Sequence, residues 1–435
     1  MLPVRYATNS MQQNTVALAG LLLLISVPMV AQLSQDTPEL IRVNQHVYCA
    51  TGYALGNVIF VLTGRSVVVV DTTEGRAAAQ AAFDDFHKVS TLPVSYIIYT
   101  HFHGDHINGA HVFAGPDTKV IAQKNHTEEL RKYRHMKGYN RKLNRAQWAA
   151  NVPREKRGAS LGVDLLNPPE AGYMEPQITF DAEYKFTEGG LRFELYHTQG
   201  ETVDHLMVWL PDIETLLPGD LFYWSFPMLA SPGKPDRPVL EWAESLDRMR
   251  QLHAAFLVGS HSRPLEGRDT IDHALANYAA AIRFVHDATV ERMNEGKPLW
   301  QIREEVKLPP ELASLPYLQP AYGTVEWGVT GVYRQYTGWY DFDPAHLAGG
   351  DPAPLAHALA EAAGGTAAIV KRARQAADAG DLQLALELAE VAIQAGDDGA
   401  AHRLRAEVLE KLAAQTTNGI KRNFYQEAAT DDARD

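Results

Sequence analysis

A short run of metal-binding residue types, Thr-His-Phe-His-Gly-Asp-His at Thr100–His106, carries the clearest chemical meaning in this sequence. His101 and His103 are separated by one residue, and Asp105 and His106 follow across a glycine. In a loop that leaves a strand, this spacing can direct the first pair at one cation and the second pair at another. Neutral imidazole and carboxylate suit Zn²⁺, although manganese and iron also accept them. The run predicts a site for two divalent metal ions, zinc first among them, that activates water for hydrolysis.

The elements expected to position these residues are short apolar strands that end in polar side chains. In the first half we predict strands at 57–62, 66–71 and 94–100 and a helix at 76–88. In the second half we predict strands at 191–197, 206–210, 215–217 and 256–260 and a helix at 239–251. The later strands again precede possible ligands, namely Glu201, Asp220 and His261. Two such halves predict two facing sheets with helices outside and the site along one edge.

Length and composition are those of a globular protein with two or three domains. The chain has 435 residues, of which 46% are hydrophobic and 21% are charged. Its formal net charge of −13 disfavours nucleic acid as a partner. The single cysteine, Cys49, excludes an internal disulfide and is expected to be a small buried residue.

The first 31 residues are typical of a signal peptide. The segment 16–31 is apolar and uncharged, follows Arg5, and ends in the small-residue step Val30-Ala31. A retained membrane anchor is the alternative, but the run is shorter than the ~20 residues of a spanning helix. We therefore expect cleavage before Gln32, export to the periplasm or medium, and no stable membrane insertion of the mature protein.

From about Asp269 the strand patterns end and helical patterns replace them. Helices are predicted at 271–296, 299–306, 382–395 and 400–414. The last two resemble one tetratricopeptide hairpin, although a single copy is not a repeat array. We assign 269–428 to a helical C-terminal domain and 429–435 to a tail.

The histidine run resembles the signature of the metallo-β-lactamase superfamily, and the resemblance extends over residues 43–265, including Asp71. It implies an α/β fold, the four-layer αββα sandwich, for a catalytic domain at 32–268. Most members have Gly-His-Thr where this chain has Gly200-Glu201-Thr202, so Glu201 replaces a histidine unless His197 or His205 serves instead. The ligand set implied for the first metal is His101, His103 and Glu201, that for the second is Asp105, His106 and His261, and Asp220 bridges them. Asp105 and Asp220 are the expected catalytic carboxylates.

Glutamate at position 201 resembles the alkyl sulfatases of this superfamily more than its lactonases, glyoxalases or β-lactamases. Aromatic motifs at 322–347 and 422–425 are similar to the dimerisation domain of those sulfatases. The resemblance implies a homodimer formed through the C-terminal helical domain. It also implies hydrolysis of a small anionic substrate, a sulfate monoester of an alcohol.

Several residues depart from the alkyl sulfatase pattern. Arg237 matches the second of two sulfate-binding arginines, but Pro232 stands at the position of the first. Lys234 can substitute as a point charge without the guanidinium fork, and Tyr322 is a third candidate for binding the ester. Asp220 replaces a bridging glutamate. The sterol-carrier-like domain that often follows in alkyl sulfatases is expected to be absent.

A cationic segment lies between the two halves, where this fold carries lid insertions. We place the lid at 123–175, and residues 124–157 contain eleven Lys and Arg against three Glu. Such a surface can focus an anionic substrate toward the metals, or it can be an ordinary solvated helical face.

Two other functional interpretations remain open at this point. One is a different hydrolase on the same scaffold, such as a lactonase, phosphodiesterase or β-lactamase. The other is a metal-bound scaffold protein whose helical domain recruits partners, which would call for a broken ligand set.

Overall fold

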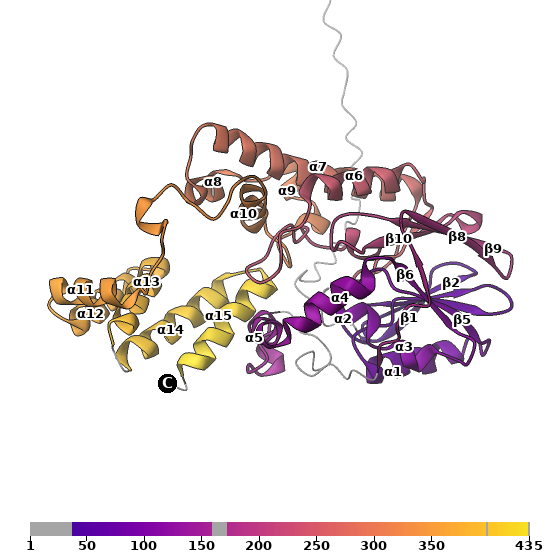
Figure 1. Cartoon of the computed structure of the whole chain (residues 1–435), viewed down its shortest axis with the longest axis horizontal. Helices are drawn as coiled ribbons and strands as arrows, with labels where there is room; N and C mark the ends of the chain where they lie inside the picture. The colour runs from indigo at the N-terminus through magenta and orange to yellow at the C-terminus, as the bar shows by residue number, and fades with distance from the viewer. Residues whose placement is uncertain (1–36, 159–171, 397–398, 434–435) are drawn as a thin grey trace, which may run out of the picture.

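The computed structural model describes residues 37–158, 172–396 and 399–433. The expected signal peptide at 1–31 and the part of the expected lid at 159–171 therefore lie outside the described residues. Within the described ranges two β-sheets face each other with helices on their outer sides, and a helical region follows (Figure 1). This confirms the α/β fold class with its αββα layers and all-helical C-terminal region.

The first sheet is mixed and has the strand order β1-β2-β3-β4-β5-β6-β7. Its strands are β1 Glu39–Arg42, β2 Val47–Thr51, β3 Val58–Leu62, β4 Val67–Val70, β5 Val94–Ile98, β6 Lys119–Gln123 and β7 Ile178–Phe180. Strands β4 to β7 are parallel neighbours, and β1 to β4 are antiparallel. The expected hairpin between β3 and β4 is present.

The second sheet has the order β13-β12-β11-β10-β9-β8. Its strands are β8 Glu183–Glu188, β9 Leu191–His197, β10 Leu206–Leu210, β11 Thr215–Leu217, β12 Phe256–Leu257 and β13 Leu265–Glu266. The only parallel pair in this sheet, within the described ranges, is β11 with β12.

Strand β4 explains why the two sheets stack. All four of its residues are valines with no exposed surface. Because side chains alternate along a strand, Val67 and Val69 pack against the outer helical layer, while Val68 and Val70 pack against the second sheet. A strand covered on both faces has no position for a polar side chain, so its sequence is a continuous apolar run.

Helices cover the outer face of each sheet (Figure 1). The first sheet is covered by α1 Arg76–His87 and α3 Ala110–Phe113, and the second by α6 Val239–Arg250 and α7 Arg268–Asn294. On the first side Phe60 stacks on Phe86 with ring centroids 4.1 Å apart. On the second side Trp242 of α6 is fully buried, and its indole NH donates to the carbonyl of Leu221 at 3.0 Å.

The lid segment is helical in the part that the structure describes. It contains α4 His126–His135 and α5 Lys137–Gln147, after the short α2 Gly104–Ile107 in the histidine run. The C-terminal region contains α8 Leu299–Glu305, α9 Pro310–Ala313, α10 Val325–Tyr336, α11 Ala353–Ala363, α12 Thr366–Asp378, α13 Leu382–Gln394, α14 Ala400–Gln415 and α15 Gly419–Asp432. No helix among the described residues is both long and apolar enough to cross a membrane.

The last helix returns to the lid. Figure 1 shows α15 beside α5, and the side chain of Asn423 donates to the carbonyl of Gln147 at 2.9 Å. Arg145 pairs with Glu427 at 3.2 Å and with Asp431 at 2.7 Å. The C-terminal region therefore supports the lid from behind, which the sequence did not indicate.

Most predicted elements lie where the sequence placed them, with a clear exception at 256–260. There β12 ends at Leu257, because the chain then leaves the sheet toward the histidine run. The backbone NH of Ser260 donates to Gly219 at 3.3 Å, and its carbonyl accepts from Asn57 at 2.7 Å. These contacts replace the ladder of the expected longer strand. Strands β1, β2, β6 to β8 and β13 were not predicted.

Candidate metal centre

The seven residues predicted to bind metal lie together at one edge of the two sheets. They form two groups in which the ligand atoms lie within 4.8 Å of one another, His101 with His103, Glu201 and Asp220, and Asp105 with His106 and His261. Each sits just beyond a strand end, after β5, between β9 and β10, after β11 or after β12. The edge is therefore built from segments more than 150 residues apart in sequence.

The first group follows β5 and faces the loop between β9 and β10. The Nε2 atom of His101 lies 2.8 Å from Nδ1 of His103, and that Nδ1 lies 3.5 Å from the Oε1 atom of Glu201. Nε2 of His101 is 3.8 Å from the Oδ2 atom of Asp220. The carboxylate of Glu201 therefore lies in one group with His101 and His103.

The second group shares Asp220 with the first. The Oδ2 atom of Asp220 lies 3.1 Å from Nε2 of His261 and 3.6 Å from Nε2 of His106. The same two imidazole nitrogens lie 3.6 and 3.5 Å from Asp105 Oδ2. Asp220 thus faces both groups, which is the placement that a bridging carboxylate needs.

Two histidines are oriented by hydrogen bonds on the side away from the cluster. Nδ1 of His106 donates to Asp71 at 2.8 Å, and Nδ1 of His261 donates to the carbonyl of Leu55 at 2.9 Å. Both imidazoles consequently turn Nε2 toward the cluster, as in metal sites where an outer hydrogen bond orients the ring.

The buried cluster contains polar atoms without partners. Among the described residues, His106 Nε2, Glu201 Oε2 and Asp220 Oδ1 are fully buried and form no hydrogen bond. Such atoms are rare in folded proteins because each lost partner costs about 1–3 kcal/mol. Burial and the neighbouring His106 and His103 also hold the pKa of His101 well below its usual range, so this imidazole is neutral. The donor set fits divalent cations, which would satisfy these atoms.

Asp71 connects three parts of the site. Its carboxylate accepts from the backbone NH and the hydroxyl of Thr100, both at 2.9 Å, and from the hydroxyl of Ser260 at 2.8 Å, besides His106. Its φ of 57° is unusual for a residue with a side chain, and these bonds hold it there.

His205 and His197 were alternatives to Glu201, and neither joins a ligand group. Nε2 of His205 accepts from the backbone NH of Asp220 at 3.1 Å, so this histidine positions the Asp220 backbone. Gly219 contacts the same ring and has a φ of 58°, where a Cβ would lie 2.6 Å from His205 Nε2. His197 instead hydrogen-bonds the carbonyl of Val203 at 2.9 Å.

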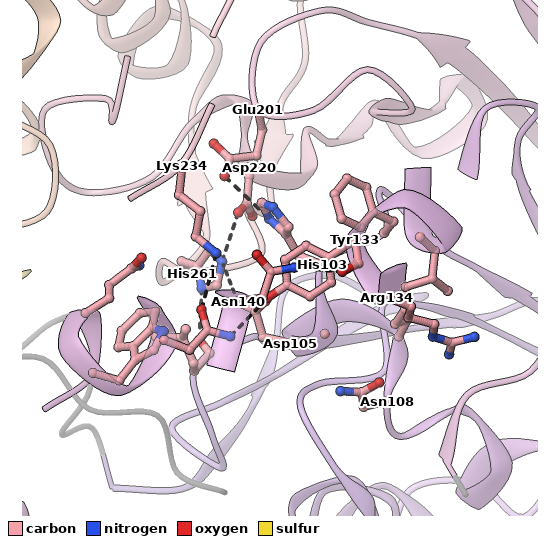
Figure 2. A pocket seen from close by; sticks show the side chains of 18 of the residues that line it. His103, Asp105, Asn108, Tyr133, Arg134, Asn140, Glu201, Asp220, Lys234 and His261 are labelled. Atoms are coloured by element: carbon pink, nitrogen blue, oxygen red, sulfur yellow. Dashed lines mark hydrogen bonds and ion pairs between the residues drawn. The ribbon is translucent and has the colours of Figure 1, made fainter. Parts of the chain in front are cut away.

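A cavity of about 520 Å³ opens from the cluster toward the lid, and Lys234, Arg237 and Tyr322 line it. Figure 2 shows Lys234 beside the ligand residues Glu201 and His261. Buried Arg237 forms an ion pair with Glu201 and donates to the carbonyl of Met228 at 2.5 Å.

Pro232, where the resemblance places the first sulfate-binding arginine, is exposed and does not line the cavity. The side chain of Lys234 does line it. Its Nζ lies 5.6 Å from the ring centroid of Tyr133 and 3.5 Å from Oδ1 of Asn144. Burial, followed by the charge of Arg237, lowers the pKa of Lys234 to about 8. A small cationic group therefore stands beside the metal ligands in place of the guanidinium fork.

Several lining residues were missed from the sequence. Phe102, Tyr133, Asn140 and Asn144 all line the cavity. Asn140 and Asn144 have a detectable signal, since they lie four residues apart on α5 and share a helix face with the cations Lys137 and Arg141. A buried pair between His126 and Asp204, at 2.9 Å, joins the start of α4 to the Glu201 loop and had no such signal.

Comparison with known proteins agrees with this geometry. The family described as "Metallo-beta-lactamase superfamily" matches residues 52–261, and "Alkyl sulfatase dimerisation" matches residues 299–434. A linear primary-alkylsulfatase from a Pseudomonas strain is 30% identical over 374 residues, which cover 82% of this chain and 70% of that protein. The chain belongs to the alkyl sulfatase family.

Other alkyl sulfatases show the same relation. An (R)-specific secondary-alkylsulfatase from Pseudomonas is 28% identical, with 92% of this chain and 63% of that protein covered. The solved structure of the stereoselective inverting sec-alkylsulfatase Pisa1 from Pseudomonas superposes with a TM-score of 0.82 at 25% identity, covering 90% of this chain and 66% of that one. This member of the family thus spans roughly two thirds of the length of the relatives it matches, from 63 to 70%.

We expect Asp71→Asn to weaken metal binding about 10–100-fold, the range for loss of a hydrogen-bond partner of a metal-bound histidine. An asparagine turns an NH₂ group toward Thr100, His106 or Ser260, all of which donate to Asp71. Metal affinity can be measured by competition with a chromogenic chelator. The control is Asp212→Asn, which removes a charge from the surface pair with Arg192. Equal affinities of Asp71→Asn and the wild type would contradict the prediction.

Proposed function

We propose that this family member is a metal-dependent hydrolase of sulfate monoesters of alcohols. The observation that carries the proposal is the shared cavity, whose wall contains members of both ligand groups and the cationic side chains of Arg237 and Lys234. Without metal ions, the three carboxylates of the two ligand groups repel an anionic ester. Two cations beside them offset that repulsion and select an anion.

The cofactors we propose are two divalent ions, most simply Zn²⁺. One would be held by His101, His103 and Glu201, the other by Asp105, His106 and His261, with Asp220 between them. Bound there, such ions polarise the ester and acidify a water molecule so that hydroxide is available near neutral pH.

The chain's own residues bind and orient the ester. The Arg237 guanidinium and the Lys234 ammonium hold its anionic oxygens by charge-assisted hydrogen bonds. Burial raises the pKa of Tyr322, so its hydroxyl keeps its proton and acts as a neutral donor. Asp105 and Asp220 are the proposed catalytic carboxylates because both face the space between the two ligand groups. Phe102 supplies an apolar wall for the alkyl group.

The test is a substrate panel with metal analysis of the same preparation. We expect sulfate release from primary or secondary alkyl sulfates, about two zinc ions per chain, loss of activity on chelation and recovery on zinc addition. Phosphate esters, lactones and β-lactams serve as the competing substrates. Turnover of any of these without release of sulfate from a sulfate ester would replace the sulfatase assignment.

We also propose a homodimer formed through the helical region. That region matches the dimerisation family and exposes large apolar side chains, with Trp339 and Phe342 each 75% exposed. Apolar surface of this kind is normally covered in an assembly. Light scattering should give twice the chain mass, and Trp339→Arg should lower it. Val89→Arg, at an exposed site on the catalytic domain, is the matched control. A monomeric wild type would exclude this arrangement.

We propose export with removal of residues 1–31. N-terminal sequencing of the protein from the periplasm or medium of a Gram-negative host should begin near Gln32, because a short apolar run after Arg5 directs secretion and cleavage. An uncleaved chain in the membrane fraction would show instead that the run is an anchor.

A further inference from the structure

We propose that the mouth of the cavity holds a second anion-binding subsite, formed by Arg134, Lys137 and Arg141. It would accept a carboxylate or a second sulfate at the far end of an alkyl sulfate, so the preferred substrate carries anionic groups at both ends. This inference rests on the proposed function, because the inner end of the substrate is placed by the sulfate ester.

One face of the lid helix α5 lines the cavity. Its lining residues, Lys137, Asn140, Arg141, Asn144, Gln147 and the following Trp148, recur every three or four positions. The basic residues between them point elsewhere. Arg145 binds Glu427 and Asp431 of α15, and Lys142 is exposed outside the lining. Of the basic residues of α5, Lys137 and Arg141 therefore face the cavity, whereas Lys142 and Arg145 lie on other faces of the helix.

The lid cations at the cavity also lack counter-charges. In α4, the cations that turn away from the cavity are paired, Arg131 with Glu128 at 2.8 Å and Lys132 with Glu129 at 2.7 Å. Arg134 instead lies over the Tyr173 ring at 4.9 Å, which leaves its charge available. Across 37–158, 172–396 and 399–433 none of Arg134, Lys137 and Arg141 forms an ion pair. Among the described residues, the mouth therefore has a positive charge that no carboxylate pairs with.

The carboxylates of the cavity lie at its inner end. Asp105, Glu201 and Asp220 are the acidic residues of the lining within the described ranges, and all three belong to the metal-ligand groups. An anion at the mouth therefore meets cations of the lid, and the cations Lys234 and Arg237 serve the ester at the other end.

Arg134 and Lys234 lie apart, with apolar surface between them. Figure 2 shows Arg134 and Lys234 on opposite sides of the labelled ligand cluster. The ring of Phe102 lies 5.0 Å from that of His103 and 5.9 Å from that of Tyr133 in α4, so it connects the ligands to the lid. Leu130 and Ile107 add to this wall. The order of cation, apolar wall and cation matches a substrate of anion, alkyl chain and anion.

The size of the cavity suits such a molecule. Its volume of about 520 Å³ lies within the range of pockets that enclose small-molecule ligands. Because Arg134, Lys137 and Arg141 are exposed, each contributes weakly and in a salt-dependent way. The subsite should alter substrate preference by a modest factor and leave the reaction at the ester unchanged.

The test compares an ω-carboxyalkyl sulfate with its methyl ester, which has nearly the same length but no distal charge. At low ionic strength the wild type should prefer the acid by about fivefold in kcat/KM, the scale of an exposed charge pair. The double variant Lys137→Gln/Arg141→Gln should lower the acid-to-ester ratio toward one, with only Arg134 left in the subsite. The matched control, Arg131→Gln/Lys142→Gln, also removes two positive charges, one from α4 and one from α5, at positions outside the cavity lining, and should keep the wild-type ratio.

Equal hydrolysis of acid and ester by the wild type would overturn the proposal. An equal loss of preference in the control variant would also overturn it, because the lid would then attract anions through its overall charge. Binding of a long α,ω-alkanedicarboxylate, measured by calorimetry against its monomethyl ester, separates this inference from the proposed function. If no sulfate ester is cleaved but the dicarboxylate binds more tightly to the wild type than to Lys137→Gln/Arg141→Gln, the function fails and the subsite stands. Equal binding to both proteins overturns the subsite.

Discussion

The rest of the site depends on the hydrogen bonds that the buried carboxylate of Asp71 accepts. It lies where β4 ends and accepts hydrogen bonds from Thr100, His106 and Ser260. These donors come from the end of β5, from α2 and from the segment after β12, so one carboxylate joins the edges of both sheets. A buried charge is stable only when donors surround it, and here the required donors are the residues beside the metal ligands. The contacts that join the edges of the two sheets are consequently also the contacts that position the ligand residues.

The cavity depends on a second, more distant contact. One wall of the cavity is formed by residues that follow the strand ends, and the opposite wall is formed by the lid. Helix α15 contacts the lid through Asn423 and Glu427. A helical region that matches a dimerisation family thus also shapes the substrate site. Tyr322, at the start of the same region, lines the cavity directly. The catalytic and helical parts form one functional unit although their sequences resemble separate domains.

Much of the fold could be predicted because its signals are local. The valines of β4, the alternation in β9 and the apolar run of β10 each report burial within a few residues, and these strands lie where the patterns placed them. The strand predicted at 256–260 was too long. The residues Val258–Ser260 are apolar or small, but Ser260 contacts Gly219 and Asn57 and does not continue the strand. Strand β8 was missed because its exposed and partly buried residues give a weak pattern. The expected roles of individual ligands and of Lys234 stay predictions, although the structure brings all of these residues together.

The sequence by itself determined the chemical types of the candidate ligands and indicated the superfamily. Both can be read from the residue types and spacing in His101–His106 and at Glu201. It also indicated a basic lid, but it left open whether that charge was solvated surface or part of a site. Only the tertiary structure decided which cations face the cavity. The physical reason is that the orientation of Arg141 and of Arg145 depends on how α5 packs against the loop at Gly233 and Lys234 and against α15. That packing joins residues nearly 300 positions apart, as in the bond from Arg145 to Asp431, and no local pattern records it.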